Sequence, residues 1–139
     1  MDSARIEQVL ALGTQHAIVE TEGDLAATMA TLVAVPVYEF YPVGGVLRGQ
    51  AAVRRYYEHL MGEFLPRVEE SRLVEQWCNE QSLIQEYDVD LRVDGVLEHH
   101  RLVGILVIGT DRLEGERIYG SEAALRRMLG DLFDELEPH

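Results

Sequence analysis

The sequence predicts an α+β fold, in which a curved antiparallel sheet packs on N-terminal helices and a further helix ends the chain. Two patterns support this fold class. Apolar residues recur at helical spacing in three segments before residue 66, whereas residues 67–119 alternate between polar and apolar with a period of two. Because helices gathered on one side of a curved sheet form a cone, the same patterns predict a pocket between the helices and the sheet.

Three helices are expected in the first half of the chain. Asp2 and Asp24 are suited to cap the first two, because a carboxylate at this position accepts hydrogen bonds from the free amides of the first turn. The second helix is expected to carry apolar residues as far as Val33. The third begins after Gly49, has the strongest apolar stripe in the chain and ends at Pro66.

Five strands are expected. The first covers residues 35–41 and is followed by a loop at residues 42–45. The other four form an antiparallel meander, in which Asp94 and Gly95 make a tight hairpin turn. A final amphipathic helix opens at Ser121. The meander strands are expected around residues 73–78, 83–93, 97–108 and 113–119.

The composition of the 139-residue chain limits its function classes. Residues 1–133 are expected to form a single domain, with residues 134–139 as a polar tail. The net charge of −13 argues against nucleic-acid binding, which requires a basic surface. No apolar run approaches the ~18 residues of a membrane span, and residues 1–17 lack the apolar core of a signal peptide. We therefore expect a cytoplasmic protein that binds neither nucleic acid nor a membrane.

Two segments carry a resemblance to a known superfamily. Residues 47–57 read as a glycine-led start of a helix, and residues 116–119, followed by residues 123–130, join the last strand to the last helix. Together with the order of elements, they resemble the nuclear transport factor two superfamily, which includes SnoaL-like polyketide cyclases, limonene epoxide hydrolase, ketosteroid isomerase and scytalone dehydratase. This resemblance implies a cone-shaped, cystatin-like barrel with a pocket for a small apolar organic ligand.

The acids that two of these families use are absent at the matching positions. Where limonene epoxide hydrolase has an Arg and two Asp residues, this chain has Tyr87, Val89 and Ile118. Where SnoaL-like cyclases have their catalytic Asp, it has Gly104. The resemblance therefore predicts the fold and leaves the reaction open.

Glu116 is the candidate catalytic acid or base. A turn near Thr110 would place it across from Gly104, where its carboxyl could replace the missing acid. Burial beside apolar residues would raise its pKa, so that it could exchange protons near neutral pH. Tyr87, Tyr38 and His100 are the expected polarising donors. The alternative is a structural role, in which Glu116 holds an arginine or a backbone group.

Strand alternation sorts the remaining candidates by face. If Tyr87 faces the pocket, then Glu86, Asp88 and Asp90 face away from it. His99 and His100 point in opposite directions and cannot share a metal ion, so no metal and no cofactor is expected. His16 and His59 are expected to be partly exposed helix residues. The expected substrate-binding residues are Tyr38, Tyr57, Trp77, Gly104 and Ile118.

The strand around residue 105 is apolar on both faces. Val103, Ile105 and Val107 lie on the face that the helices do not cover. An apolar face without a cover favours association, so a homodimer through the outer face of the sheet is expected.

Two functions are compatible with these residues. The first is a cofactor-free proton-transfer enzyme, which would be a cyclase, isomerase or dehydratase that acts on a carbonyl-bearing apolar substrate, with Glu116 as its acid or base. The alternative is a non-catalytic ligand-binding or dimerisation module. The absence of acids at Val89, Gly104 and Ile118 favours this alternative.

Overall fold

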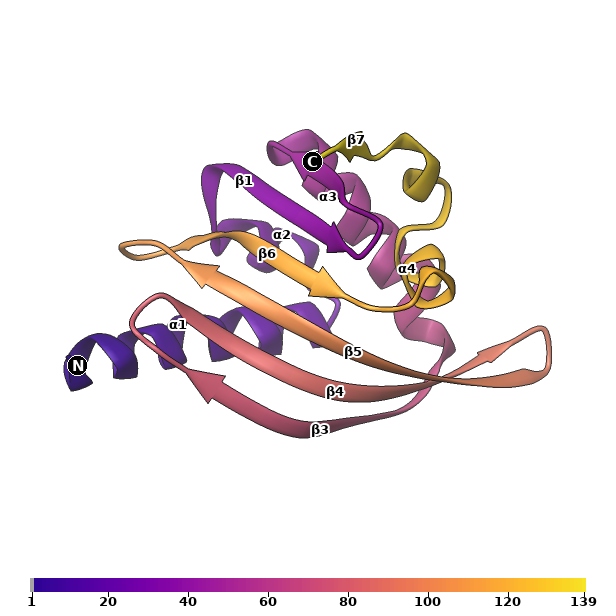
Figure 1. The fold of residues 1–139 in the computed structure, drawn as a ribbon, viewed down its shortest axis with the longest axis horizontal. Helices are drawn as coiled ribbons and strands as arrows, with labels where there is room; N and C mark the ends of the chain where they lie inside the picture. Colours follow the sequence, from indigo (N-terminus) through magenta and orange to yellow (C-terminus); the bar gives the residue numbers. More distant parts are fainter. Residues whose placement is uncertain (1) are drawn as a thin grey trace.

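The computed structural model describes residues 2–139, in which helices cover one face of a strongly curved sheet (Figure 1). The α+β prediction is confirmed. The helices and strands are α1 (Ser3–Thr21), α2 (Leu25–Ala30), β1 (Leu32–Tyr41), β2 (Gly45–Arg48), α3 (Gln50–His59), β3 (Val68–Cys78), β4 (Ser82–Val93), β5 (Val96–Ile108), β6 (Leu113–Tyr119), α4 (Glu122–Leu129) and β7 (Glu137–Pro138). Three short helical segments, η1 (Leu60–Phe64), η2 (Leu65–Arg67) and η3 (Gly130–Glu135), connect them.

The sheet has seven strands in the order β3-β4-β5-β6-β1-β2-β7. The expected meander forms β3 to β6, and every pair in it is antiparallel. The first strand, β1, pairs with the last strand of the meander, β6, and this pair is parallel. The sheet is therefore mixed, and its earliest strand lies inside the sheet, between β6 and β2, rather than at an edge.

Two short strands are absent from the sequence interpretation. The strand β2 begins at Gly45, at the end of the expected loop, and pairs with β1. The strand β7 lies inside the expected polar tail, where Pro138 pairs with Gly45 and Glu137 with Val46. Both strands are too short to show a period of two, and β7 is defined only by its pairing with the distant strand β2.

The expected helix caps are confirmed. The carboxylates of Asp2 and Asp24 accept hydrogen bonds from the amides of Arg5 (3.1 Å) and Ala27 (3.0 Å). The Ser121 hydroxyl accepts one from the amide of Ala124 (3.1 Å). No helix within residues 2–139 combines the length and the hydropathy that a membrane span requires.

Two helix ends differ from expectation. Helix α2 stops at Ala30, because Leu32 and Val33 already belong to β1. The third helix does not run as an α-helix to Pro66, because a π-helical turn, η1, replaces it from Leu60 onward. This wider turn directs Leu60 and Phe64 toward the inside of the cone.

The face of the sheet away from the helices carries the charged rows that alternation predicts. Arg101 makes a two-pronged ion pair with Asp88 (2.7 and 2.9 Å), and His99 bonds to Asp90 (2.6 Å). Val103, Ile105 and Val107 are half-buried on this face. The homodimer expected through these three residues stays a prediction.

Gly115 is required where β6 pairs with both of its neighbours. Its φ of +153° suits glycine, and a Cβ atom there would overlap the carbonyl oxygen of Val37 in β1. We expect Gly115→Ala to lower the free energy of unfolding by at least about 3 kcal/mol, because either the parallel β1–β6 pair or the backbone of β6 must shift. Urea denaturation followed by circular dichroism measures this change.

Gly62 offers the matched control for this substitution. It lies in η1, and a Cβ atom there would meet nothing within 4 Å. Gly62→Ala should change the free energy of unfolding by less than about 1 kcal/mol. Equal effects of the two substitutions would contradict the steric role of Gly115.

Candidate functional site

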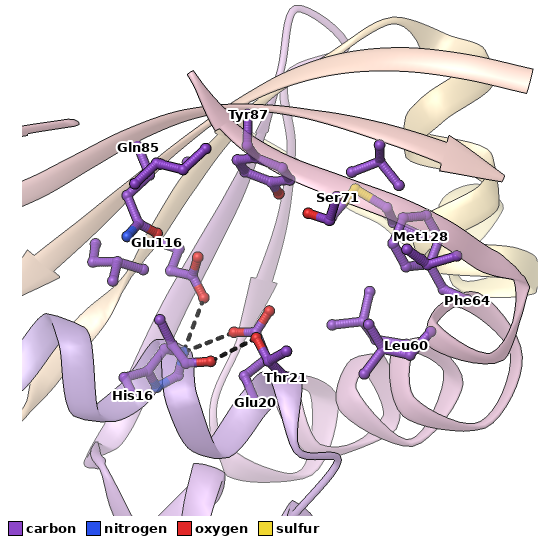
Figure 2. A pocket seen from close by; sticks show the side chains of 17 residues that line it. His16, Glu20, Thr21, Leu60, Phe64, Ser71, Gln85, Tyr87, Glu116 and Met128 are labelled. Carbon is purple, nitrogen blue, oxygen red and sulfur yellow. Dashed lines mark hydrogen bonds and ion pairs between the residues drawn. The ribbon is translucent and has the colours of Figure 1, made fainter. Parts of the chain in front are cut away.

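A cavity of about 310 Å³ lies between the helices and the inner face of the sheet (Figure 2). Most of its lining is apolar. Three ionisable side chains from α1 and β6 gather on one wall, called here the polar wall, and they are His16, Glu20 and Glu116. Leu60 and Phe64 of η1 close the far side. The other polar side chains of the lining come from α1, β3 and β4, and they are Thr21, Ser71, Gln85 and Tyr87.

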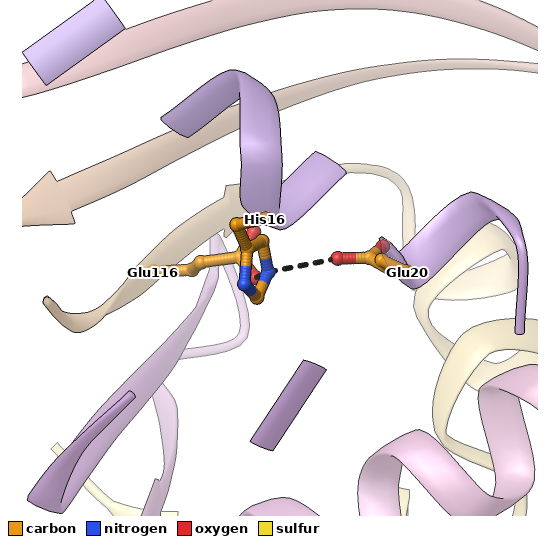
Figure 3. Close-up of side chains that lie close together, drawn as sticks. All are labelled: His16, Glu20 and Glu116. Carbon is orange, nitrogen blue, oxygen red and sulfur yellow. Dashed lines mark ion pairs between the residues drawn. The ribbon is translucent and has the colours of Figure 1, made fainter. Parts of the chain in front are cut away.

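Three titratable side chains meet on the polar wall (Figure 3). His16 and Glu20 are one helical turn apart on α1, so both point to the same side. The Nε2 atom of His16 lies 3.0 Å from Glu20 Oε2 and 3.4 Å from Glu116 Oε2. The Tyr57 hydroxyl, from α3, donates to Glu116 Oε2 at 2.8 Å and lies 3.0 Å from His16 Nε2.

The hydrogen bonds fix the protonation of His16. The Thr31 hydroxyl donates its one hydrogen to the carbonyl of Thr28 (2.6 Å), so it accepts from His16 Nδ1 (2.6 Å). The other ring nitrogen faces two carboxylates, which accept hydrogen bonds when ionised. With these carboxylates ionised, the second nitrogen also carries a proton, and His16 is an imidazolium that donates from both nitrogens.

The pKa of His16 agrees with this assignment. Its side chain is fully buried, and burial alone would lower the pKa. The hydrogen bonds to Glu116 and Glu20 outweigh that effect and raise the pKa of His16 to about 10. Burial, followed by the nearby charge of Glu116, raises the pKa of Glu20 above its ordinary value.

Two tyrosines hold one oxygen of Glu116 in place. Tyr57 uses its hydrogen on Glu116 Oε2, so Tyr38 donates to the Tyr57 hydroxyl. Burial raises the pKa of both tyrosines well above the ordinary value, and both stay protonated. The second oxygen, Glu116 Oε1, has no hydrogen-bond partner among residues 2–139 and is not sealed off from the cavity.

Gly104 opens the space between Glu116 and Tyr87. A Cβ atom at position 104 would lie 4.0 Å from Glu116 Oε1 and 3.9 Å from the Tyr87 ring. The Tyr87 hydroxyl points into the cavity (Figure 2) and makes no hydrogen bond within the described part of the chain. Burial raises the pKa of Tyr87, so the hydroxyl stays protonated and can donate. The bare backbone at Gly104 is thus bordered by a carboxylate oxygen and by the ring of a tyrosine whose hydroxyl can donate.

The structure brings some of the expected site residues together. Glu116, Tyr87 and Gly104 all line the cavity. Tyr57 and Tyr38 lie behind Glu116 and do not line the cavity, so they can affect a ligand there only through the hydrogen bonds that orient Glu116.

The expected register of Glu116 is wrong by two residues. It pairs with Leu106, and Ile118 pairs with Gly104. Because side chains alternate between the two faces of a strand, an error of two residues in the register leaves Glu116 on the inner face of the sheet. The irregular pairing at Val107 and Ile108 accounts for one residue of this error, because a bulge cannot be seen in the alternation, and the other residue arises because the turn is centred just after Thr110 rather than on it.

Besides Tyr57 and Tyr38, three expected site residues lie outside the cavity lining. His100 is on the inner face of β5 but beyond the end of the cavity, where it bonds to Glu98 (3.0 Å). Trp77 is 45% exposed on the edge strand β3. Ile118 is buried in the core of the sheet.

The sequence analysis missed His16 and Glu20. His16 was expected to be partly exposed, but it follows the spacing of Val9 and Gly13, which form the buried stripe of α1. The sequence pattern instead favoured a stripe through Ile18, which is 49% exposed. A helix phase set by Gly13, which packs against Leu83, would have placed His16 inside.

The same side chains have the composition of a metal site. The donor atoms of His16, Glu20 and Glu116 all lie within 4.8 Å of one another. A divalent ion would need the lone pair of His16 Nε2, which carries a proton in this arrangement.

The charge of His16 links stability to pH. Its folded pKa of about 10 lies above the ordinary 6.5, so the folded protein holds an extra proton between these values. This stabilisation is complete below about pH 6.5 and is lost as the pH rises toward 10. We expect the free energy of unfolding to fall over this range by up to about 1.4 kcal/mol per pH unit.

Urea denaturation between pH 6 and pH 10 measures this slope. The double variant His16→Gln/Glu20→Gln removes the titrating imidazole together with one of the two carboxylates that would otherwise take up a proton in its place, and it should flatten the slope. Parallel slopes in the wild-type protein and the variant would show that His16 does not hold its proton as assigned.

The sequence matches no family model and no curated protein, whereas its structure has clear relatives. An NTF2-like protein from Anabaena variabilis has 16% sequence identity and a TM-score of 0.71, over 88% of this chain and 94% of that chain. Bal32a, from a soil-derived mobile gene cassette, has 11% identity and a TM-score of 0.72, over 90% and 98% of the two chains.

A third relative was solved with a small molecule. It is a hypothetical protein with a ketosteroid isomerase-like fold from Catenulispora acidiphila, in complex with trimethylamine. Its identity is 12% and its TM-score 0.63, over 86% of this chain and 92% of that chain. These likenesses confirm the expected fold: the protein has the NTF2-like, ketosteroid isomerase-like fold.

Proposed function

We propose that the protein is a cofactor-free proton-transfer enzyme, a cyclase, isomerase or dehydratase that acts on a small, carbonyl-bearing, mainly apolar molecule. One observation carries the proposal. Glu116 Oε1 faces the cavity without a hydrogen-bond partner in residues 2–139, next to the bare backbone of Gly104, and the same cavity is lined by Tyr87, whose hydroxyl also has no partner there. A base and an oxygen donor are the two groups that enolisation requires.

In the proposed reaction, Glu116 Oε1 removes a proton from the carbon next to the substrate carbonyl. The Tyr87 hydroxyl donates a hydrogen bond to the carbonyl oxygen and stabilises the enolate that forms. Glu116 then returns the proton to a carbon or oxygen atom of the substrate. His16 and Tyr57 hold Glu116 through its other oxygen, Oε2, so that Oε1 stays directed into the cavity, toward the substrate carbon.

The apolar lining supports this chemistry. Leu60, Phe64 and Met128 face the polar wall and keep water away from a developing enolate (Figure 2). A protein of similar fold was solved in complex with a small molecule, trimethylamine, which is in keeping with a small-molecule ligand.

The alternative function is a non-catalytic ligand-binding module. It is favoured by the absence of acids at Val89, Gly104 and Ile118, where the families that the sequence resembles have theirs. The two functions differ in one observable, which is exchange of a substrate proton.

Exchange of ketone α-protons with solvent tests the proposal without knowledge of the full reaction. Cyclohexanone and 2-cyclohexenone are incubated with the protein in D₂O, and loss of the α-proton signals is followed by NMR. We expect protein-dependent exchange, and Glu116→Gln should slow it by at least about 100-fold because the base is lost.

Glu114→Gln is the matched control. Glu114 lies on the same strand, β6, is exposed and does not line the cavity. This variant should exchange ketone protons at the wild-type rate. Exchange that survives in Glu116→Gln would reject Glu116 as the base, and absence of exchange in the wild-type protein would favour the binding module.

Tyr87→Phe tests the proposed oxygen donor. Because the Tyr87 hydroxyl makes no hydrogen bond within residues 2–139, its removal should change the free energy of unfolding by less than about 1 kcal/mol. Exchange should slow by about 10- to 100-fold, because the enolate loses its donor. An unchanged exchange rate in a stable Tyr87→Phe protein would remove Tyr87 from the mechanism.

A further inference from the structure

The polar wall of the cavity holds more negative than positive charge. Two carboxylates, Glu20 and Glu116, share one cation, the His16 imidazolium. No Arg or Lys side chain lines the cavity in the part of the chain that the structure describes. A buried carboxylate without a counter-charge is costly, so the site favours a further positive group or a proton.

The excess charge belongs to Glu20. Glu116 receives the Tyr57 hydroxyl at 2.8 Å in addition to His16, whereas Glu20 lies 3.4 Å from that hydroxyl. The side chain of Glu20 is 27% exposed, compared with 9% for Glu116. Glu20 Oε1 has no hydrogen-bond partner in residues 2–139, so a ligand in the cavity can reach it.

An organic cation fits this site better than a metal ion. Both nitrogens of His16 donate hydrogens, one to Thr31 and one to the carboxylates, so neither offers a lone pair to a metal. An ammonium group needs only acceptors, which Glu20 provides. The rest of the 310 Å³ cavity is mostly apolar and suits the hydrocarbon part of such a ligand.

We propose that the ligand of this cavity carries a protonated amine on an apolar body, with the ammonium paired to Glu20 and the apolar part against Leu60 and Phe64. This inference deepens the proposed function and rests on it for the cavity as the substrate site. It names the substrate class as amine-bearing carbonyl compounds, with Glu20 as the charge-selecting residue and Glu116 free to act as the base.

Three probes of the same shape and different charge test the inference on the full chain. Cyclohexylammonium, cyclohexanol and cyclohexanecarboxylate are titrated into the protein at pH 7 by calorimetry. We expect the ammonium to bind at least tenfold more tightly than the alcohol and the carboxylate not to bind. In Glu20→Gln the ammonium and the alcohol should bind within about twofold of each other.

Glu22→Gln is the matched control, because it removes the same charge from an exposed position just after α1. It should keep the preference for the ammonium. An equal loss of preference in Glu22→Gln would assign the effect to the net charge of the protein and overturn the inference. Three other results would also overturn it: cyclohexanol binds more tightly than cyclohexylammonium, none of the probes binds, or Zn²⁺ titrated by itself binds more tightly than cyclohexylammonium.

The inference and the proposed function fail in different measurements. A wild-type protein that exchanges ketone protons but prefers cyclohexanol overturns the inference alone. A protein that prefers cyclohexylammonium but exchanges no ketone proton supports the inference for binding and overturns proton transfer alone.

Discussion

The arrangement of the site depends on the ion pairs between the buried imidazolium of His16 and two carboxylates. One ring nitrogen is held by Thr31, and the other faces Glu20 and Glu116. Without this charge, two carboxylates would lie close together inside an apolar cone, and one of them would have to take up a proton or turn away. The histidine therefore permits an ionised carboxylate at a place where the surrounding side chains would otherwise exclude it.

The two carboxylates of this cluster differ because their surroundings differ. Glu116 is nearly enclosed, receives a tyrosine hydroxyl and presents its free oxygen beside Gly104. Glu20 is nearer to solvent and has only the shared imidazolium within 3.0 Å. The surroundings of Glu116 suit a base whose orientation must be fixed, and those of Glu20 suit recognition of a charged ligand. Pairs of acids that are divided in this way by their environment are a common basis for separate chemical roles.

Short sequence patterns predicted those features that a few neighbouring residues determine, such as helix caps and the face of a strand on which a side chain lies. The caps at Asp2, Asp24 and Ser121 follow from single residues, and the inward face of Glu116 follows from the period of a strand. Features that depend on distant pairing could not be predicted in this way. The strand β7 exists because β2 lies beside it, and the register of Glu116 depends on a bulge. His16 was missed for a related reason. Two neighbouring stripes of α1 are similar in sequence, and only the packing of the helix against the sheet decides which of them, the one with His16, is buried.

The parallel pairing of β1 with β6 joins the early and the late parts of the chain at the site. Tyr57 lies 41 residues from His16 and 59 residues from Glu116 along the sequence. Contacts of this separation cost more loop-closure entropy than local contacts do, because long segments must be brought together before they can form. The cluster therefore requires α1, α3 and β6 to be in place at the same time. A ligand that binds only this arrangement stabilises it by mass action, so occupancy of the cavity makes the stability of the first helix depend on that of a strand about a hundred residues later in the chain.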